Sequence, residues 1–278
     1  FAVTIAAALA EAQQVIGRLE ARVLLRHVLS CEEAFLIAHG DDELTAEQSA
    51  DFGRLIARRA AGEPVAYLTG SREFYGREFT VTPAVLIPRP DTELLIELSL
   101  QRLPVNGGRV LGLGTGSGCI GVTIAAERPQ CRVTLVDASA EALDVARGNA
   151  YRYAAANTTL LHSDWYAALA DAQYDLIVAN PPYISAGDAH LQQGDLRFEP
   201  PAALAAGADG LADIRRIVAE APSHLASGGW LLCEHGHDQA DTCTALLQQT
   251  GFVEVFSARD LAGIRRVSGG RWTPGSSA

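Results

Sequence analysis

Residues 109–120 read Arg-Val-Leu-Gly-Leu-Gly-Thr-Gly-Ser-Gly-Cys-Ile, an apolar run that leads into alternating glycines. The apolar run is typical of a buried strand that ends near Leu113, and a helical pattern begins at Ile120. Glycine in the turn between them allows positive φ and lets the backbone approach a ligand where any Cβ would collide. The following helix starts with unpaired N–H groups that point toward the loop. The pattern predicts a ligand-binding loop formed by Gly114, Thr115, Gly116, Ser117 and Gly118.

The next two expected strands each end in side chains suited to a nucleoside. Residues 131–136 are expected to form a strand that ends at Asp137, whose carboxylate can accept hydrogen bonds from ribose hydroxyls. Residues 159–163 lead to Asp164 and Trp165, where an adenine could meet an aromatic face. Ordinary structural interpretations stay open, a helix N-cap for Asp137 and a core residue for Trp165. Nicotinamide dinucleotides and S-adenosylmethionine both carry a ribose, so Asp137 does not distinguish them.

A fourth strand is expected at residues 174–179 and stops at Asn180-Pro181-Pro182-Tyr183. Proline has no backbone N–H, so two consecutive prolines cannot continue a sheet ladder. We therefore expect the Asn180 amide at the carboxyl edge of a parallel sheet, which is where open α/β sheets bind their ligands. The alternative is an ordinary strand-to-loop turn.

Together these motifs follow four successive strands, and their spacing resembles that of class I S-adenosylmethionine-dependent methyltransferases. The Asn-Pro-Pro-Tyr segment is similar to that of the subset that methylates planar amide or amino nitrogens. Four further segments resemble the release-factor glutamine methyltransferases, the PrmC (HemK) family, and the likeness covers residues 16–271. These segments are Gly62–Gly70, Ile87–Glu93, Arg197–Pro200 and Glu234–Gly236.

The resemblance implies transfer of a methyl group from S-adenosylmethionine, with S-adenosylhomocysteine as product. The implied acceptor is the side-chain nitrogen (N5) of the glutamine in the Gly-Gly-Gln motif of class I peptide-chain release factors, a modification that modulates translation termination. The oxygen of Asn180 and the backbone carbonyl of Pro181 would accept the two amide hydrogens, while Pro182 and Tyr183 pack against the flat amide. Asn180 is thus the expected catalytic residue. The glycine loop, Asp137, Trp165 and Asn180 are the expected cofactor-binding residues.

The periodicity predicts two domains joined by a linker. Residues 1–71 have helical spacing and are expected to bind the substrate. One helix face carries Leu19, Val23, Leu24, His27 and Val28, and Thr45 with Gln48 forms a capping box. Residues 72–90 alternate like a β-hairpin linker, and residues 91–278 alternate helix and strand. The expected fold is therefore a Rossmann-like, mostly parallel sheet with helices on both faces. Asp91 or Thr92 is the expected cap of a helix over 93–102, and Arg197–Pro200 is a candidate wall of the substrate cleft or a surface loop.

Composition narrows the choice of partners and compartment. The formal net charge is −11 and all 22 basic residues are arginine, which argues against a nucleic-acid partner and excludes a Schiff-base or Walker lysine. The 5 cysteines are scattered without zinc spacing, which indicates reduced thiols in the cytoplasm and no metal site. No apolar run is long enough to span a membrane, and the start lacks a signal-peptide pattern. We expect a monomer.

One departure from the family pattern keeps other functions open. Gly112 stands where the family usually has an acid beneath the cofactor, so a cofactor-binding module with impaired catalysis is one alternative. An N6-adenine DNA methyltransferase shares the Asn-Pro-Pro-Tyr logic but would need basic surface. An NAD-dependent dehydrogenase would use the G-x-G-x-x-G match at residues 116–121, although its first glycine follows the strand end too late.

Overall fold

The structure is a computed structural model that describes residues 3–275. The chain divides into two compact units. Unit 1 holds the residues up to Ser71 together with Gln193–Phe198, and unit 2 holds Arg72–Gln192 together with the residues from Glu199 onward. Within residues 3–275, no helix combines the length and the apolar character that crossing a bilayer requires.

Unit 1 is a bundle of helices. Its elements are α1 (Ile5–Ile16), α2 (Arg18–Leu29), α3 (Glu33–Ala38), α4 (Ala46–Ala60), α5 (Val65–Thr69) and the 3₁₀ helix η3 (Gly194–Phe198). The predicted capping box is confirmed, because Thr45 Oγ1 accepts the N–H of Gln48 at 3.1 Å and Gln48 Oε1 accepts that of Thr45 at 2.9 Å. The expected apolar face of α2 is partly wrong. Leu24 and Leu25 are fully buried but Leu19, in the first turn, is 76% exposed.

The 3₁₀ helix η3 is fastened to unit 1 by two arginines. Arg59 of α4 donates hydrogen bonds to Glu20 of α2 at 2.8 Å and to Asp195 of η3 at 3.1 Å. Arg197 of η3 donates to the carbonyl of Ala61, just after α4, at 2.6 Å. A segment far from the bundle in sequence therefore belongs to it in space.

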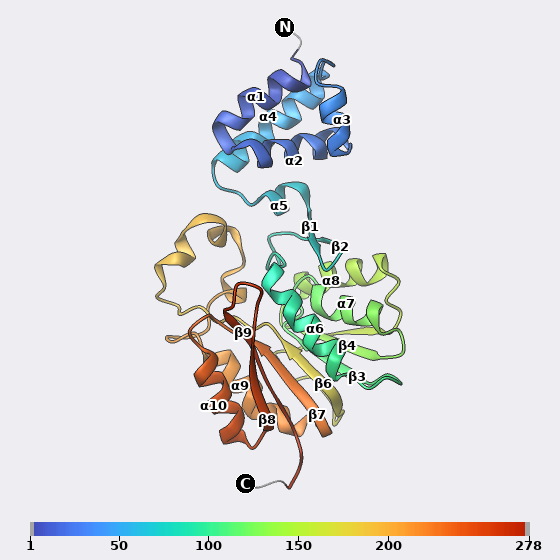
Figure 1. Ribbon diagram of the computed structural model, residues 1–278, viewed down its shortest axis with the longest axis vertical. Coiled ribbons are helices and arrows are strands. Elements are labelled where there is room, and N and C mark those ends of the chain that lie inside the picture. The colour runs from blue at the N-terminus through green and yellow to red at the C-terminus, as the bar shows by residue number, and fades with distance from the viewer. Residues whose placement is uncertain (1–2, 276–278) are drawn as a thin grey trace. The chain divides into compact units, whose positions relative to one another are not determined.

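Unit 2 is an α/β sandwich around a 7-stranded sheet with the strand order β5-β4-β3-β6-β7-β9-β8 (Figure 1). Its strands are β3 (Arg109–Leu113), β4 (Arg132–Asp137), β5 (Thr158–His162), β6 (Tyr174–Ala179), β7 (Leu225–Glu234), β8 (Val253–Arg259) and β9 (Arg265–Arg271). Its helices are α6 (Glu93–Arg102), α7 (Cys119–Glu127), α8 (Ala140–Arg152), α9 (Ala212–Glu220), α10 (Ala240–Thr250) and the 3₁₀ turns η1 (Pro90–Thr92), η2 (Ala189–Gln192), η4 (Pro201–Ala203) and η5 (Ala221–Ser223). β3 to β7 are parallel, and β9 pairs antiparallel with β7 and β8. The predicted fold class is confirmed.

The order in which the chain adds strands to the sheet changes direction at β3, although the strands on both sides remain parallel to it. From β3 the chain moves outward through β4 to β5, and it then returns to place β6 on the other side of β3. The register pairs Leu113 with Val136 on one side and with Ala179 on the other, so these strands end level with one another. A crevice at such a switch point is where doubly wound sheets bind ligands.

The sheet separates two hydrophobic cores, as strand alternation requires. Val110, Leu135 and Leu176 pack against α6 and α7, whereas Leu111 and Ile177 pack against α9 and α10. All five side chains are fully buried. Both faces are covered, which explains why these strands read as continuous apolar runs.

One leucine packs between two glycines in the first of these cores. An ideal Cβ on Gly112 of β3 would lie 2.9 Å from Leu135 Cδ2, and one on Gly121 of α7 would lie 2.0 Å from the same atom. Leu135 of β4 thus uses the space that both glycines leave open. Gly112 therefore has a packing function that the sequence interpretation, centred on a missing acid, did not foresee.

The segment before the sheet differs from the expected linker. The hairpin consists of β1 (Ser71–Phe74) and β2 (Arg77–Thr80), so its ladder ends at Thr80, ten residues before the expected end of the linker at residue 90. Helix α6 begins at Glu93 as predicted, but neither expected cap forms. Thr92 is already in the αR conformation and makes no capping hydrogen bond, because its hydroxyl group contacts Asn180 instead.

Candidate active site

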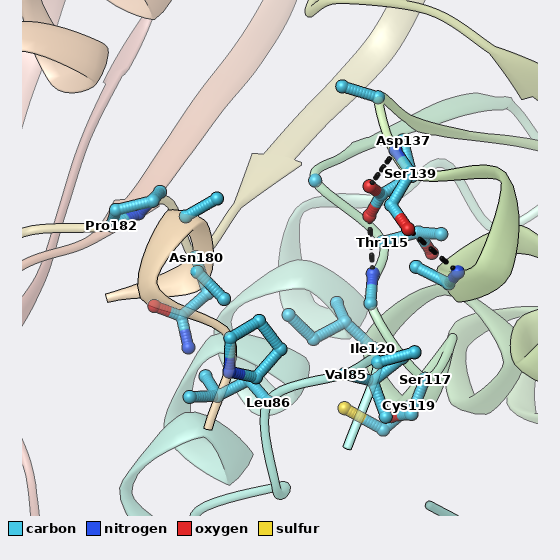
Figure 2. A pocket seen from close by; sticks show the side chains of 18 of the residues that line it. Val85, Leu86, Thr115, Ser117, Cys119, Ile120, Asp137, Ser139, Asn180 and Pro182 are labelled. Carbon is cyan, nitrogen blue, oxygen red and sulfur yellow. Dashed lines mark hydrogen bonds between the residues drawn. The ribbon is translucent and has the colours of Figure 1, made fainter. Parts of the chain in front are cut away.

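A cavity of about 410 Å³ opens at the carboxyl ends of β3, β4 and β6. Small-molecule sites typically have volumes of ~300–1,000 Å³. Figure 2 shows Asn180 and Pro182 on one side of the cavity and Thr115, Asp137 and Ser139 on the other. The structure therefore brings the motifs after β3, β4 and β6 to one site, at the switch point of the sheet.

The glycine loop after β3 has the backbone geometry that its sequence predicts. Gly114, Gly116 and Gly118 all have positive φ, at 60°, 53° and 83°. An ideal Cβ on Gly114 would lie 3.1 Å from Trp165 Cζ3, and Gly116 has open space beside it. Gly114 to Ser117 line the cavity, whereas Gly118 does not. Gly118 lies at the N-cap of α7, where a Cβ would lie 3.1 Å from Ala146 Cβ of α8.

Asp137 fixes the loop and is not the helix cap. Its Oδ2 accepts the N–H of Gly116 at 2.8 Å, and its Oδ1 accepts the N–H of Ser139 at 2.9 Å (Figure 2). Ser139 is the N-cap of α8, since its hydroxyl accepts the N–H of Ala142 at 3.1 Å. The alternative N-cap interpretation of Asp137 is therefore wrong, and its carboxylate ties the glycine loop to the edge of the cavity.

Trp165 lines the cavity in a strained conformation. Its φ is 48°, which is uncommon for a residue other than glycine and is found at functional sites more often than elsewhere. Ser163 Oγ donates to the Trp165 carbonyl at 2.9 Å and helps hold this turn. Burial raises the pKa of Asp213, and a hydrogen bond from the Trp165 side chain opposes the rise. Asp164 is held differently, because Arg216 donates to both of its carboxylate oxygens at 2.8 Å.

Asn180 lies at the carboxyl end of β6, where the sequence placed it. Its Nδ2 donates to Thr92 Oγ1 at 3.3 Å. Its Oδ1 is buried and has no hydrogen-bond partner among residues 3–275. A buried acceptor without a donor costs about 1–3 kcal/mol. One face of this amide is therefore fixed, and the other has an unmet capacity to accept a hydrogen bond.

The remaining residues of the Asn-Pro-Pro-Tyr segment differ in position. Pro182 lines the cavity, whereas Pro181 and Tyr183 do not. Tyr183 packs against the core on the α9 and α10 side of the sheet, and its carbonyl accepts the Gln239 side-chain N–H at 2.9 Å. Burial raises the pKa of Tyr183 to about 12. The phenol is thus protonated at neutral pH and is unsuited to act as a base.

Two further segments complete the cavity wall, and the second overlaps the candidate wall expected at Arg197–Pro200. Residues 84–92 and 200–203 supply side chains to its lining, among them Leu86, Arg89 and Pro200. Glu199, which is 3% exposed, holds the two together. It accepts the Ile87 N–H at 3.1 Å and pairs with the Arg89 guanidinium. The segments 87–93 and 197–200 resemble the family and were the only sequence feature that could have pointed to this wall of the cavity. Their pairing across more than a hundred residues could not be read from spacing.

The sheet order and the cavity at its switch point define a Rossmann-like methyltransferase fold, and comparison with known proteins agrees. A family model described as the methyltransferase small domain matches residues 90–196, and one described as the PrmC N-terminal domain matches residues 4–70. The crystal structure of a methyltransferase from Pyrococcus furiosus has a TM-score of 0.56 and 18% identity, covering 78% of this chain and 97% of that one.

Sequence relatives specify the family. A release factor glutamine methyltransferase of Bordetella pertussis is 55% identical over 257 residues, which cover 92% of this chain and 95% of that protein. The release factor glutamine methyltransferase of Escherichia coli is 46% identical over 255 residues, covering 92% of each chain. The chain belongs to the release factor glutamine methyltransferase family.

Proposed function

We propose that this protein transfers a methyl group from S-adenosylmethionine to the side-chain amide nitrogen of a glutamine in a class I peptide-chain release factor, at the Gly-Gly-Gln motif. The observation that carries the proposal is the Asn180 carboxamide, which faces the glycine loop and Asp137 across one cavity. Family membership indicates the class of reaction, and the cavity offers residues that could bind and orient the cofactor and the target amide. A helical unit that binds the release factor, at residues 1–71, is part of the same proposal.

The residues of the cavity fit the cofactor. Positive φ at Gly114 and Gly116 lets the loop backbone approach a ligand closely. Asp137 offers carboxylate oxygens for the ribose hydroxyls, and the Trp165 ring offers an aromatic face for adenine. S-adenosylmethionine, when bound, supplies a methyl group that the sulfonium has already activated. The chain's own residues therefore need only bind, orient and exclude water.

Asn180 is proposed to bind the target nitrogen. A primary amide is planar and poorly nucleophilic because its nitrogen lone pair is delocalised into the carbonyl. Asn180 Oδ1 and the Pro181 carbonyl can accept its two hydrogens, hold the nitrogen and favour the pyramidal geometry of attack. The unmet acceptor on Oδ1 supports this assignment. Positioning of this kind supplies up to ~7–11 kcal/mol when the geometry is close to that of attack.

No side chain needs to remove the proton before the methyl group transfers. The amide nitrogen is neutral, and the proton leaves after methylation has made the nitrogen acidic. Tyr183, with its raised pKa, does not serve as a base. The formal net charge of −11 favours a protein substrate over a polyanion such as DNA. The 5 cysteines, all free thiols, support a cytoplasmic protein, and we propose a monomer.

Mass spectrometry of a purified class I release factor tests this function. The factor is incubated with the protein and S-adenosylmethionine, digested and mapped. We expect one added methyl group on the glutamine of the Gly-Gly-Gln loop, and far less of that product in the same time when Asn180→Ala replaces the wild type. Transfer to duplex DNA instead, or binding of NAD in preference to S-adenosylmethionine, would overturn the proposal.

A further inference from the structure

A buried carboxyl group lies directly behind the proposed catalytic amide. Glu234 is the last residue of β7. The residue before it, Cys233, pairs with Ala179, the last residue of the neighbouring strand β6. Asn180 and Glu234 therefore leave adjacent parallel strands at the same level. Glu234 is 1% exposed and does not line the cavity, so its side chain reaches the site only through its neighbours.

Thr92 connects the two side chains. Its Oγ1 accepts the Nδ2–H of Asn180 at 3.3 Å, and Thr92 itself is 2% exposed. Hydrogen bonding by the Thr92 and Asn180 side chains lowers the pKa of the Glu234 carboxyl group, so both are its neighbours. A threonine hydroxyl can accept from one neighbour and donate to the other. The carboxyl group and the amide nitrogen thus share Thr92 as a buried neighbour.

We propose that Glu234 is a positioning residue that, in its ionised form, holds Nδ2 of Asn180 and so turns Oδ1 toward the substrate amide. An ionised carboxyl group only accepts hydrogen bonds, so it fits the Nδ2 side of the amide and the Thr92 hydroxyl. A protonated carboxyl group carries a donor that competes for the Asn180 oxygen. The inference rests on the proposed function, since it assigns Oδ1 to the substrate amide.

The surroundings make this carboxyl group able to titrate near neutral pH. Burial raises the pKa of Glu234 to about 7, and the nearby Asp91 raises it as well. Thr92, Asn180 and the Arg266 guanidinium of β9 lower it. Tyr183 and Cys119 also face this carboxylate, and its charge raises their pKa values. Its Oε2 has no hydrogen-bond partner among residues 3–275, which leaves the buried ion incompletely compensated.

The pH profile of turnover tests the assignment. With saturating release factor and cofactor, wild-type turnover should rise as the pH increases through about 7 and then level off. Glu234→Gln should lower the plateau roughly tenfold, since a charge-assisted hydrogen bond is lost, and should abolish the pH dependence. Thr92→Val should keep the pH dependence but move its midpoint to higher pH, because a donor that stabilises the ionised form is removed. Affinity for S-adenosylhomocysteine should not change in Glu234→Gln, because that side chain does not line the cavity.

The controls separate positioning from a structural effect. Glu97→Gln, an exposed acid on α6, makes the same charge change and should reproduce the wild-type profile. A flat wild-type profile between about pH 5.5 and about pH 8.5, or an unchanged profile in Glu234→Gln, would overturn the inference. If the wild type methylates no release factor at all, the proposed function fails instead, and the two failures are thereby distinguished.

Discussion

The buried acid also predicts an unusual pH dependence of stability, which can be measured without any activity. Glu234→Gln removes a carboxyl group whose pKa rises from 4.5 to about 7 because folding buries it. Each pKa unit corresponds to ~1.4 kcal/mol, so the ionised group lowers the free energy of unfolding by about 3 kcal/mol at high pH.

The sign follows from where the proton binds more tightly. Below about pH 4.5 the group is protonated in both states and costs nothing, whereas above about pH 7 the folded state must bury the ion. The free energy of unfolding of the wild type should therefore fall by about 3 kcal/mol, relative to Glu234→Gln, as the pH rises through this window.

Urea unfolding of both proteins at a series of pH values measures this difference directly. Glu97→Gln, compared with the wild type in the same way, should show no such trend because that side chain is exposed. A difference between wild type and Glu234→Gln that stays constant across the window would refute the reasoning, since it would mean that the carboxyl group titrates alike in both states.

Two further substitutions test the packing and the cofactor site. Gly112→Ala should lower the free energy of unfolding by ~1–3 kcal/mol, because its Cβ would lie 2.9 Å from Leu135 Cδ2. In a Leu135→Ala background that penalty should disappear, and equal penalties in the two backgrounds would show that the contact is not its cause. Asp137→Asn should weaken S-adenosylhomocysteine binding by about ten- to a hundredfold, since an amide cannot accept at both positions, measured by calorimetry. Asp144→Asn, an exposed acid on α8, is the matched control and should bind like the wild type.

The motifs at strand ends could be predicted because their positions depend on local chemistry alone. Two prolines stop β6 at Asn180, and glycines stop β3 at Gly114, whatever the rest of the chain does. Parallel pairing then brings both to one edge of the sheet. This is why the placement of Asp137 and Trp165 beside the cavity also agrees with the expectation. Their assigned roles stay predictions.

The features that could not be predicted depend on contacts between distant segments. Thr92 stands at a position typical of a helix cap, but its hydroxyl group accepts a hydrogen bond from the Asn180 side chain instead. Glu199 fastens one wall of the cavity to residues more than a hundred positions earlier, which no spacing rule specifies. Leu19 fits an apolar stripe on a helical projection and is nevertheless exposed, since helical spacing does not say where the packed neighbours end.

Gly112 is a further position where a contact with a distant segment could not be predicted from the sequence. Its sequence context suggested a lost carboxylate beneath the cofactor. In the structure Gly112 does not line the cavity, and Leu135 occupies the space beside it. An added side chain would first meet that leucine, so its earliest effect is expected on packing rather than on cofactor contact.

The central claim is that Asn180 clamps the target amide and contributes far more to turnover than to cofactor affinity. It is tested most directly by measuring, on one preparation of Asn180→Ala, both the rate of methyl transfer to release factor and the affinity for S-adenosylhomocysteine. We predict a fall in turnover of roughly a hundredfold or more, with affinity changed by no more than a few-fold. Turnover close to that of the wild type, or a loss of affinity as large as the loss of turnover, would contradict the account.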